Sequence, residues 1–376
     1  MIRFFAPALC SLALHSTNPP TASDVRADAR PDARVFAVRA DRVLLGDGQV
    51  LAPGVILTEA GRITAVGADL SIPEDAVVVV HKGTASAGLI ALHSHSGSPG
   101  EMRDSTRTVL PEAHIAAAFD PSSEDFESAM EAGITSLVLA PLPFSLCGGT
   151  SALVKTSGGV VLEREAQLSL GFSAQSLRND RAPTSFGGAL AELERRLVQP
   201  EGMFALAAKK KLPVLFEAAT REDVLRVVEF AARHELVGTI HGAAWAGELA
   251  DQIKSAGLSV ICGPFQVGEA RRDLLAVLAL GKAEIPFGFG VDAPWNHPAA
   301  LRTSAAICVR EGLDRATAWR ALTSDAARIV GAQDRVGALA KGLDADIVLW
   351  SGDPLDLASS VDAVYVDGKR AWEKKL

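Results

Sequence analysis

The chain has 376 residues, of which 48% are hydrophobic, so it can bury a core large enough for a barrel of about 250 residues and a second, smaller domain. Its 45 Asp and Glu residues outnumber 37 Lys and Arg residues, and the formal net charge is −8. This balance argues against a nucleic acid or an anionic membrane as a partner. Four scattered cysteines form no CxxC pair, so neither a disulfide framework nor a zinc knuckle is predicted.

The first residues are typical of a secretory signal peptide. Arg3 precedes an apolar run over residues 4–14, and the small residues Thr21-Ala22-Ser23 follow a polar stretch. The apolar run is too short to span a membrane as a helix. We therefore expect residues 1–34 to be a disordered leader and linker, and the protein to be exported to the periplasm or the envelope. A cytoplasmic protein with an N-terminal tail is the alternative.

Strand patterns without intervening helices occupy both ends of the remaining chain. Short β-rich runs lie near its start, at residues 35–38, 42–45, 55–59, 62–66 and 76–81. Two further runs, 345–350 and 361–366, lie near its end. Because isolated hairpins bury too little surface to be stable alone, we expect residues 35–85 and 335–376 to form one composite β-sandwich domain.

Strands and helices alternate through the middle of the chain. The early strands are predicted at 86–93, 134–140 and 152–156, whereas the segment 158–186 fits neither pattern. From residue 212 the alternation is regular, with strands at 212–217, 236–241, 258–262 and 285–292, each followed by a helical pattern. Such alternation predicts parallel strands, and so many units favour an α/β fold with a (β/α)8 TIM-like barrel over residues 86–334.

The strongest chemical signal is the strand that ends in His93-Ser94-His95. Side chains two positions apart on a strand share a face, so the two imidazoles point the same way. The C-terminal ends of barrel strands are where barrel active sites lie, and a pair of imidazoles there is half of a metal site. Two surface histidines remain the alternative explanation of this pattern taken alone.

Other predicted strands also end in residues that suit a metal site. His241 ends a strand and is followed by Gly242, and Asp292 ends another. An aspartate in this position can bind a metal and take a proton from an attacking water. Lys155 lies near a strand end as well, either on the surface or as a carbamate that bridges two metals. Trp245 and Trp295 follow two strand ends, where they are expected to shape the pocket.

Three segments resemble the signatures of the amidohydrolase superfamily, and its imidazolonepropionase-like branch is nearest. Residues 86–95 resemble the first-strand signature, residues 131–135 the second helix-to-strand turn, and residues 337–353 the C-terminal signature. The resemblance implies a metal-dependent hydrolase that acts on carbon–nitrogen bonds other than peptide bonds in a small-molecule amide or cyclic amide. We also expect a homo-oligomer or a pairing with a related amidohydrolase. The resemblance implies a site made of His93, His95 and His241 as metal ligands, Asp292 as ligand and catalytic residue, and Lys155.

The chain departs from the family pattern at two positions. Ala91 stands where the family usually has an acidic residue, and the strand that should end in a ligand histidine carries Glu217 instead. A carboxylate can bind zinc, whereas in the alternative Glu217 contacts only solvent or a neighbouring strand. We therefore expect a divalent metal, zinc, with at most one ion tightly bound. The rival hypothesis is a paralogue that has lost its chemistry and serves as a binding or partner protein.

Overall fold

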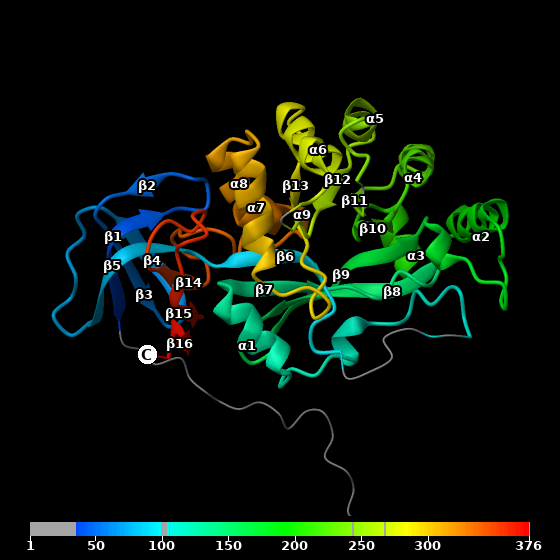
Figure 1. The fold of residues 1–376 in the computed structure, drawn as a ribbon. Coiled ribbons are helices and arrows are strands. Elements are labelled where there is room, and N and C mark those ends of the chain that lie inside the picture. Colours follow the sequence, from blue (N-terminus) through cyan, green and yellow to red (C-terminus); the bar gives the residue numbers. More distant parts are fainter. Residues whose placement is uncertain (1–34, 99–103, 105, 243, 267, 376) are drawn as a thin grey trace, which may run out of the picture.

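A computed structural model describes residues 35–98, 104, 106–242, 244–266 and 268–375. The expected leader, residues 1–34, lies outside the described residues. Two sheets lie side by side, one built from both ends of the chain and one surrounded by helices (Figure 1). Within the described ranges, no helix is both long and apolar enough to cross a membrane.

The first sheet, called the composite sheet below, joins strands from the two ends of the chain. Its order is β16-β15-β14-β5-β1-β3-β4, and β2 pairs with β1. The antiparallel pairing of β14 with the last residues of β5 connects the two halves. The strands are β1 (Phe36–Leu44), β2 (Val50–Leu51), β3 (Gly54–Glu59), β4 (Arg62–Gly67), β5 (Val77–Ala87), β14 (Ile347–Trp350), β15 (Val361–Val366) and β16 (Lys369–Glu373).

The composite sheet curls so that one face becomes a core of its own. The N–H of Ile63 donates to the carbonyl of Leu343 at 2.9 Å, which brings β4 against the segment that precedes β14. Side chains alternate between the two faces of a strand, and the inward-facing members form one buried cluster. That cluster includes Val38, Ile56, Ile63, Ala85, Ile347, Leu349 and Tyr365.

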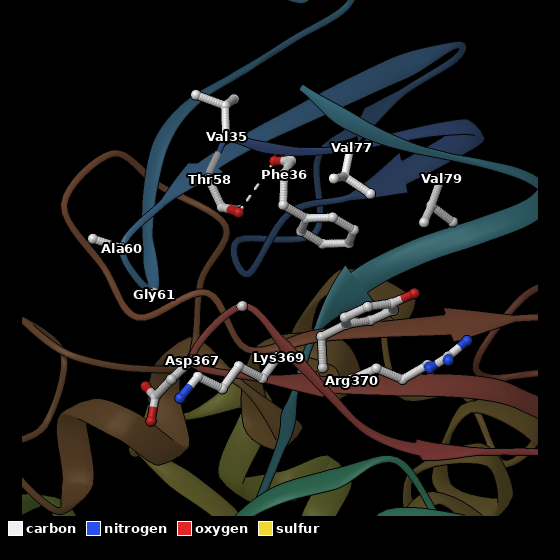
Figure 2. A pocket seen from close by; sticks show the side chains of 12 residues that line it. Val35, Phe36, Thr58, Ala60, Gly61, Val77, Val79, Asp367, Lys369 and Arg370 are labelled. Atoms are coloured by element: carbon white, nitrogen blue, oxygen red, sulfur yellow. Dashed lines mark hydrogen bonds between the residues drawn. The ribbon is translucent and has the colours of Figure 1, made fainter. Parts of the chain in front are cut away.

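A cavity of about 460 Å³ opens in the composite sheet (Figure 2). Phe36 of β1 and Val77 and Val79 of β5 line one side, and Lys369 and Arg370 of β16 line the other. None of these residues lines the cavity at the barrel strand ends that is described below. The two cavities are therefore separate features of the fold.

The second sheet, the barrel sheet, is nearly closed. Its eight strands follow one another in chain order. A hydrogen bond connects the two edge strands, β6 and β13: the N–H of Val291, just after β13, donates to the carbonyl of His93 in β6 at 2.9 Å. The mixed α/β class and a TIM-like barrel are thus confirmed. The strands are β6 (Leu89–Ser94), β7 (Ile134–Leu139), β8 (Cys147–Lys155), β9 (Val161–Gly171), β10 (Val214–Glu217), β11 (Gly238–His241), β12 (Ser259–Cys262) and β13 (Phe287–Phe289).

The strict (β/α)8 pattern is not present, because β8 runs antiparallel to both β7 and β9. These three strands follow one another without an intervening α-helix. The strand β9 lies within the segment 158–186, which matched no pattern in the sequence. Its first five residues are all exposed or half-buried, and only the remaining six are buried. A strand that is buried along half of its length lacks the continuous apolar run of a buried parallel strand.

The helices stand outside the barrel strands (Figure 1). In α4, the spacing of the buried residues Val224, Val227, Phe230 and Ala231 gives one apolar face toward the sheet. A capping box between Thr220 and Asp223 begins this helix. The α-helices within the described residues are α1 (Glu124–Glu131), α2 (Phe186–Val198), α3 (Gly202–Ala208), α4 (Arg221–Arg233), α5 (Ala250–Ser255), α6 (Arg271–Lys282), α7 (Ala300–Arg310), α8 (Arg315–Leu322) and α9 (Ser324–Ile329).

The reversed direction of β8 places Lys155 against the composite sheet and away from the other predicted ligands. Its side chain is fully buried, and its Nζ lies 2.8 Å from Asp344, 2.9 Å from Asp346 and 2.7 Å from Asp367. Burial alone would lower the pKa of this ammonium, but the charges of Asp346 and Asp367 raise it above its ordinary value. Lys155 therefore links the barrel to the composite sheet as a cation, and the expectation of a carbamate between two metals does not fit this position.

Replacing Lys155 tests this link. The substitution Lys155→Met removes the cation and leaves buried carboxylates without their shared partner, so the free energy of unfolding should fall by about 3–5 kcal/mol. Lys210→Met is the matched control, because Lys210 forms an exposed pair with Glu235 and such pairs contribute at most about 1 kcal/mol. Urea unfolding of both variants measures the difference. Equal, small effects would show that the buried cluster does not hold the two sheets together.

Candidate metal centre

Four barrel strands bring ionisable side chains to one cavity of about 320 Å³. Glu217 of β10 and His241 of β11 occupy paired positions in register, at the last residue of each parallel strand. His93 lies next to the end of β6, and Asp292 follows β13. The complete lining is His93, His95, Leu142, Pro143, Phe144, Ser173, Gln175, Glu217, Ala218, Ala219, His241, Gly242, Asp292 and Trp295.

Two imidazoles and two carboxylates contact one another in this cavity. His93 Nδ1 lies 2.5 Å from an Asp292 oxygen, and His93 Nε2 lies 3.2 Å from a Glu217 oxygen. His241 Nδ1 lies 2.8 Å from the other Glu217 oxygen, and its Nε2 lies 3.5 Å from Asp292. The rings of His93 and His241 stack with their centroids 3.7 Å apart. Each carboxylate thus contacts both imidazoles.

This pairing shifts the pKa values of the groups in opposite directions. Burial alone would lower the pKa of His93, but the charge of Glu217 and the hydrogen bonds to Asp292 and Glu217 raise it to about 10. Burial alone would raise the pKa of Glu217, but the charges of His241 and His93 hold it well below its usual range. The pKa of Asp292 is lowered by the same two histidines against the effect of its burial. Both carboxylates are therefore ionised at neutral pH.

His95 is held in the form that binds a metal. Its Nδ1 donates to the carbonyl of Ala140 at 2.9 Å, which leaves the lone pair on Nε2 free of that bond. Burial and the charge of His93 lower the pKa of His95 to about 4, so this ring is neutral at physiological pH. Its ring centroid lies 4.9 Å from that of His93, edge to face.

Asp292 is positioned by an uncommon backbone conformation. Its φ of 48° lies in the left-handed region, and its N–H donates to the carbonyl of His93 at 3.2 Å. Aspartate enters this region more readily than most residues but still at some cost. Such strained residues concentrate at functional sites because the surrounding structure must hold them there.

The donor atoms fit a divalent metal. One ligand atom from each of His93, His241 and Asp292 lies within 4.8 Å of the other two, and a set of imidazole nitrogens and a carboxylate oxygen suits zinc. Glu217 contacts both of these histidines and could contribute a further oxygen. Because imidazole must lose its proton to bind a metal, a metal ion and protons compete for this site.

The structure therefore brings five of the six candidate site residues to one cavity and leaves Lys155 elsewhere. Of the two tryptophans, Trp295 lines the cavity, whereas Trp245 packs its ring under the guanidinium of Arg272. Sequence reasoning missed Ser173 and Gln175, because they follow β9, which showed no strand pattern. It also missed residues 142–144, although they follow the recognised strand β7 and could have been found from that position.

Three comparisons with known proteins each find similarity to amidohydrolases. A sequence profile of the Amidohydrolase family matches residues 201–371. An imidazolonepropionase from Xanthomonas oryzae pv. oryzae is 25% identical over an alignment of 418 positions, which covers 97% of this chain. The structure of an amidohydrolase from Thermotoga maritima covers 90% of this chain and 100% of its own, with a TM-score of 0.82 and 21% identity. These similarities support membership of the amidohydrolase superfamily, whose profile matches the sequence of residues 201–371 directly.

The relatives differ from this chain in length and in sequence. The chain spans 46% of the length of the imidazolonepropionase that it matches. A prolidase solved in complex with N-methylphosphonate-L-proline covers 90% of this chain and 100% of its own, with a TM-score of 0.60 and 15% identity. At this identity, the prolidase and the Thermotoga protein establish the amidohydrolase fold alone.

The glycine after His241 tests how tightly the site is built. Gly242 has a φ of 77°, and a Cβ added there would lie 2.3 Å from the carbonyl oxygen of Ala218. Gly242→Ala should therefore lower the free energy of unfolding and displace His241, which reduces the metal bound per chain. Gly257→Ala is the matched control, because Gly257 has a φ of 67° with no neighbour within 4 Å.

The Gly257→Ala control separates the effect of the close contact with Ala218 from the effect of the left-handed backbone conformation. A left-handed alanine costs about 1–2 kcal/mol by itself, so Gly257→Ala should show this loss alone with unchanged metal content. Unfolding curves and elemental analysis of both variants provide the comparison. If the two variants behave alike, the close approach of Gly242 to Ala218 does not position His241.

Proposed function

We propose that this protein is a metal-dependent hydrolase of carbon–nitrogen bonds other than peptide bonds, acting on a small-molecule amide or cyclic amide. The observation that carries the proposal is the convergence of His93, His241 and Asp292 at the strand ends of an amidohydrolase barrel. The similarity to an imidazolonepropionase supports the same reaction class. His95, whose Nδ1 is fixed on Ala140, and Glu217 are further candidate ligands. A catalytic zinc ion takes about three protein ligands and keeps one position for water, so it would not use all five residues at once.

The metal we propose is a single zinc ion. Zinc held by these residues would supply a Lewis acid that could polarise a carbonyl and lower the pKa of a water molecule. Asp292 then accepts a proton from the attacking water and passes it to the leaving nitrogen, so that amide and water give acid and amine. Its position beside both histidines, with a lowered pKa, keeps it ionised and able to accept that proton.

Whether Glu217 binds the metal distinguishes an active site from one that has lost its activity. In the proposal it replaces the histidine that the family pattern places on this strand. Its two oxygens contact different imidazoles, at 3.2 Å from His93 and 2.8 Å from His241, and the side chain is almost fully buried. This geometry supports a ligand role over contact with solvent. The alternative that fits the same contacts is pairing with His241 on the neighbouring strand β11 without a metal. A paralogue without chemistry remains the outcome to be expected if Glu217 and the metal prove unrelated.

Metal content is the first measurement. Protein purified without chelator should hold at most one tightly bound zinc ion per chain, and removal of that ion should abolish hydrolysis of amides and cyclic ureides until zinc is restored. Glu217→Ala should lower the zinc occupancy, because it removes a candidate ligand and one of the two carboxylates that His93 and His241 share. Elemental analysis and a hydrolysis assay measure both effects.

Two further variants serve as controls for Glu217. Glu217→His should retain zinc, since imidazole is also a zinc ligand. Glu235→Ala removes an exposed carboxylate far from the cavity lining and should leave zinc occupancy unchanged. If Glu217→Ala has no effect on zinc, or if the wild-type chain binds no metal and hydrolyses nothing, the site has decayed. Two zinc ions per wild-type chain would show that the ligand set is misassigned.

A further inference from the structure

Beside its ionisable residues, the cavity at the strand ends has an apolar wall. Leu142, Pro143 and Phe144 follow β7 and are each partly buried, and Trp295 follows Asp292 after β13. The chain thus supplies apolar surface from two loops to the same cavity as the proposed ligands. A substrate held for reaction at His93 and His241 must contact this wall, because the cavity of about 320 Å³ is small.

Trp295 is the part of this wall that is available to a ligand. Its side chain is 65% exposed, and among the described residues with exposed large apolar side chains it is the only aromatic one. Its ring centroid lies 4.6 Å from that of His95. A large exposed indole leaves much apolar surface in contact with water, and an apolar ring that packs on it gains both burial and aromatic contact.

The charges of the cavity disfavour an anionic substituent. Its described lining residues include the carboxylates Glu217 and Asp292, and no lysine or arginine is among them. An anionic substituent would find no lysine or arginine to pair with among these lining residues, because His93 and His241 are already engaged by Glu217 and Asp292. The same lining accepts an uncharged group without this penalty.

We propose that the substrate is an uncharged amide or cyclic amide that carries a flat apolar substituent, and that Trp295 determines this specificity. The substituent packs on Trp295 and on residues 142–144, while the scissile group faces His93 and His241. This inference rests on the proposed function for the place of bond cleavage. It adds the chemical class of the substrate and a residue that selects it.

Three hydantoins test the proposal, because they share one cyclic ureide and differ in one substituent. 5-Phenylhydantoin carries a flat apolar group, 5-methylhydantoin a small one, and hydantoin-5-acetate an anion. Calorimetric binding to metal-free and zinc-loaded protein should give the phenyl compound about tenfold tighter binding than the methyl compound, and the acetate the weakest binding. Hydrolysis of the same compounds is followed separately.

Matched variants assign the preference to Trp295. Trp295→Leu should reduce the tenfold preference to about threefold or less at unchanged zinc content, whereas Trp295→Phe should retain most of it because the ring remains. Trp245→Leu is the control for loss of an indole, since Trp245 packs on Arg272 and not on the cavity. It should leave the preference intact.

The two proposals fail in different ways. Hydrolysis that favours hydantoin-5-acetate would overturn the substrate class and leave the hydrolase standing. A Trp295-dependent preference for 5-phenylhydantoin without any hydrolysis would support the substrate class and count against the hydrolase. Equal binding of the three compounds, binding of none, or a preference that survives Trp295→Leu would each overturn the role of Trp295.

Discussion

Charged side chains inside the barrel need partners of opposite charge, because an unpaired buried charge costs far more than folding can offset. At the strand ends, Glu217 and Asp292 each contact the same two stacked histidines. At the other end, Lys155 contacts three aspartates of the composite sheet. The first pairing creates a place where a metal can replace protons. The second connects the composite sheet to the barrel, in addition to the apolar contacts of β14 and β15 with the barrel core.

The parts of this structure that depend on local pattern were accessible from the sequence. Alternating strand and helix signals gave the mixed α/β barrel, and the spacing of His93 and His95 on one strand placed two imidazoles on one face. His241 and Asp292 were found because each follows an apolar strand, and parallel strands present their ends at a common edge. The position of Glu217 came from the family resemblance, whereas its contacts with both histidines are visible only in the structure.

The direction of β8 could not be predicted in this way. A period of two reads the same in a parallel and an antiparallel strand, and the partly exposed β9 gave no apolar run to mark the hairpin between them. Because β8 was expected to be parallel, Lys155 was expected among the metal ligands. It does lie near a strand end, but at the opposite end of the barrel from the other candidate ligands. Its partners are Asp344, Asp346 and Asp367, and the last two lie 191 and 212 residues further along the chain. The strand patterns of those segments do not indicate a contact with Lys155.

The reversed strand imposes a rule on insertions and deletions. Phe144, in the apolar wall, shortly precedes β8, and Lys155 ends it, so one strand of nine residues, about 30 Å long, joins the cavity to the buried aspartates. Adding or removing a single residue within it would turn every later side chain to the other face of the sheet. Lys155 would then lose its contacts with the aspartates, or the strand would shift along its neighbours and displace residues 142–144 from the cavity. We therefore expect relatives that keep both features to keep the number of residues between them, or to absorb a change in a β-bulge such as those already present between β8 and β9.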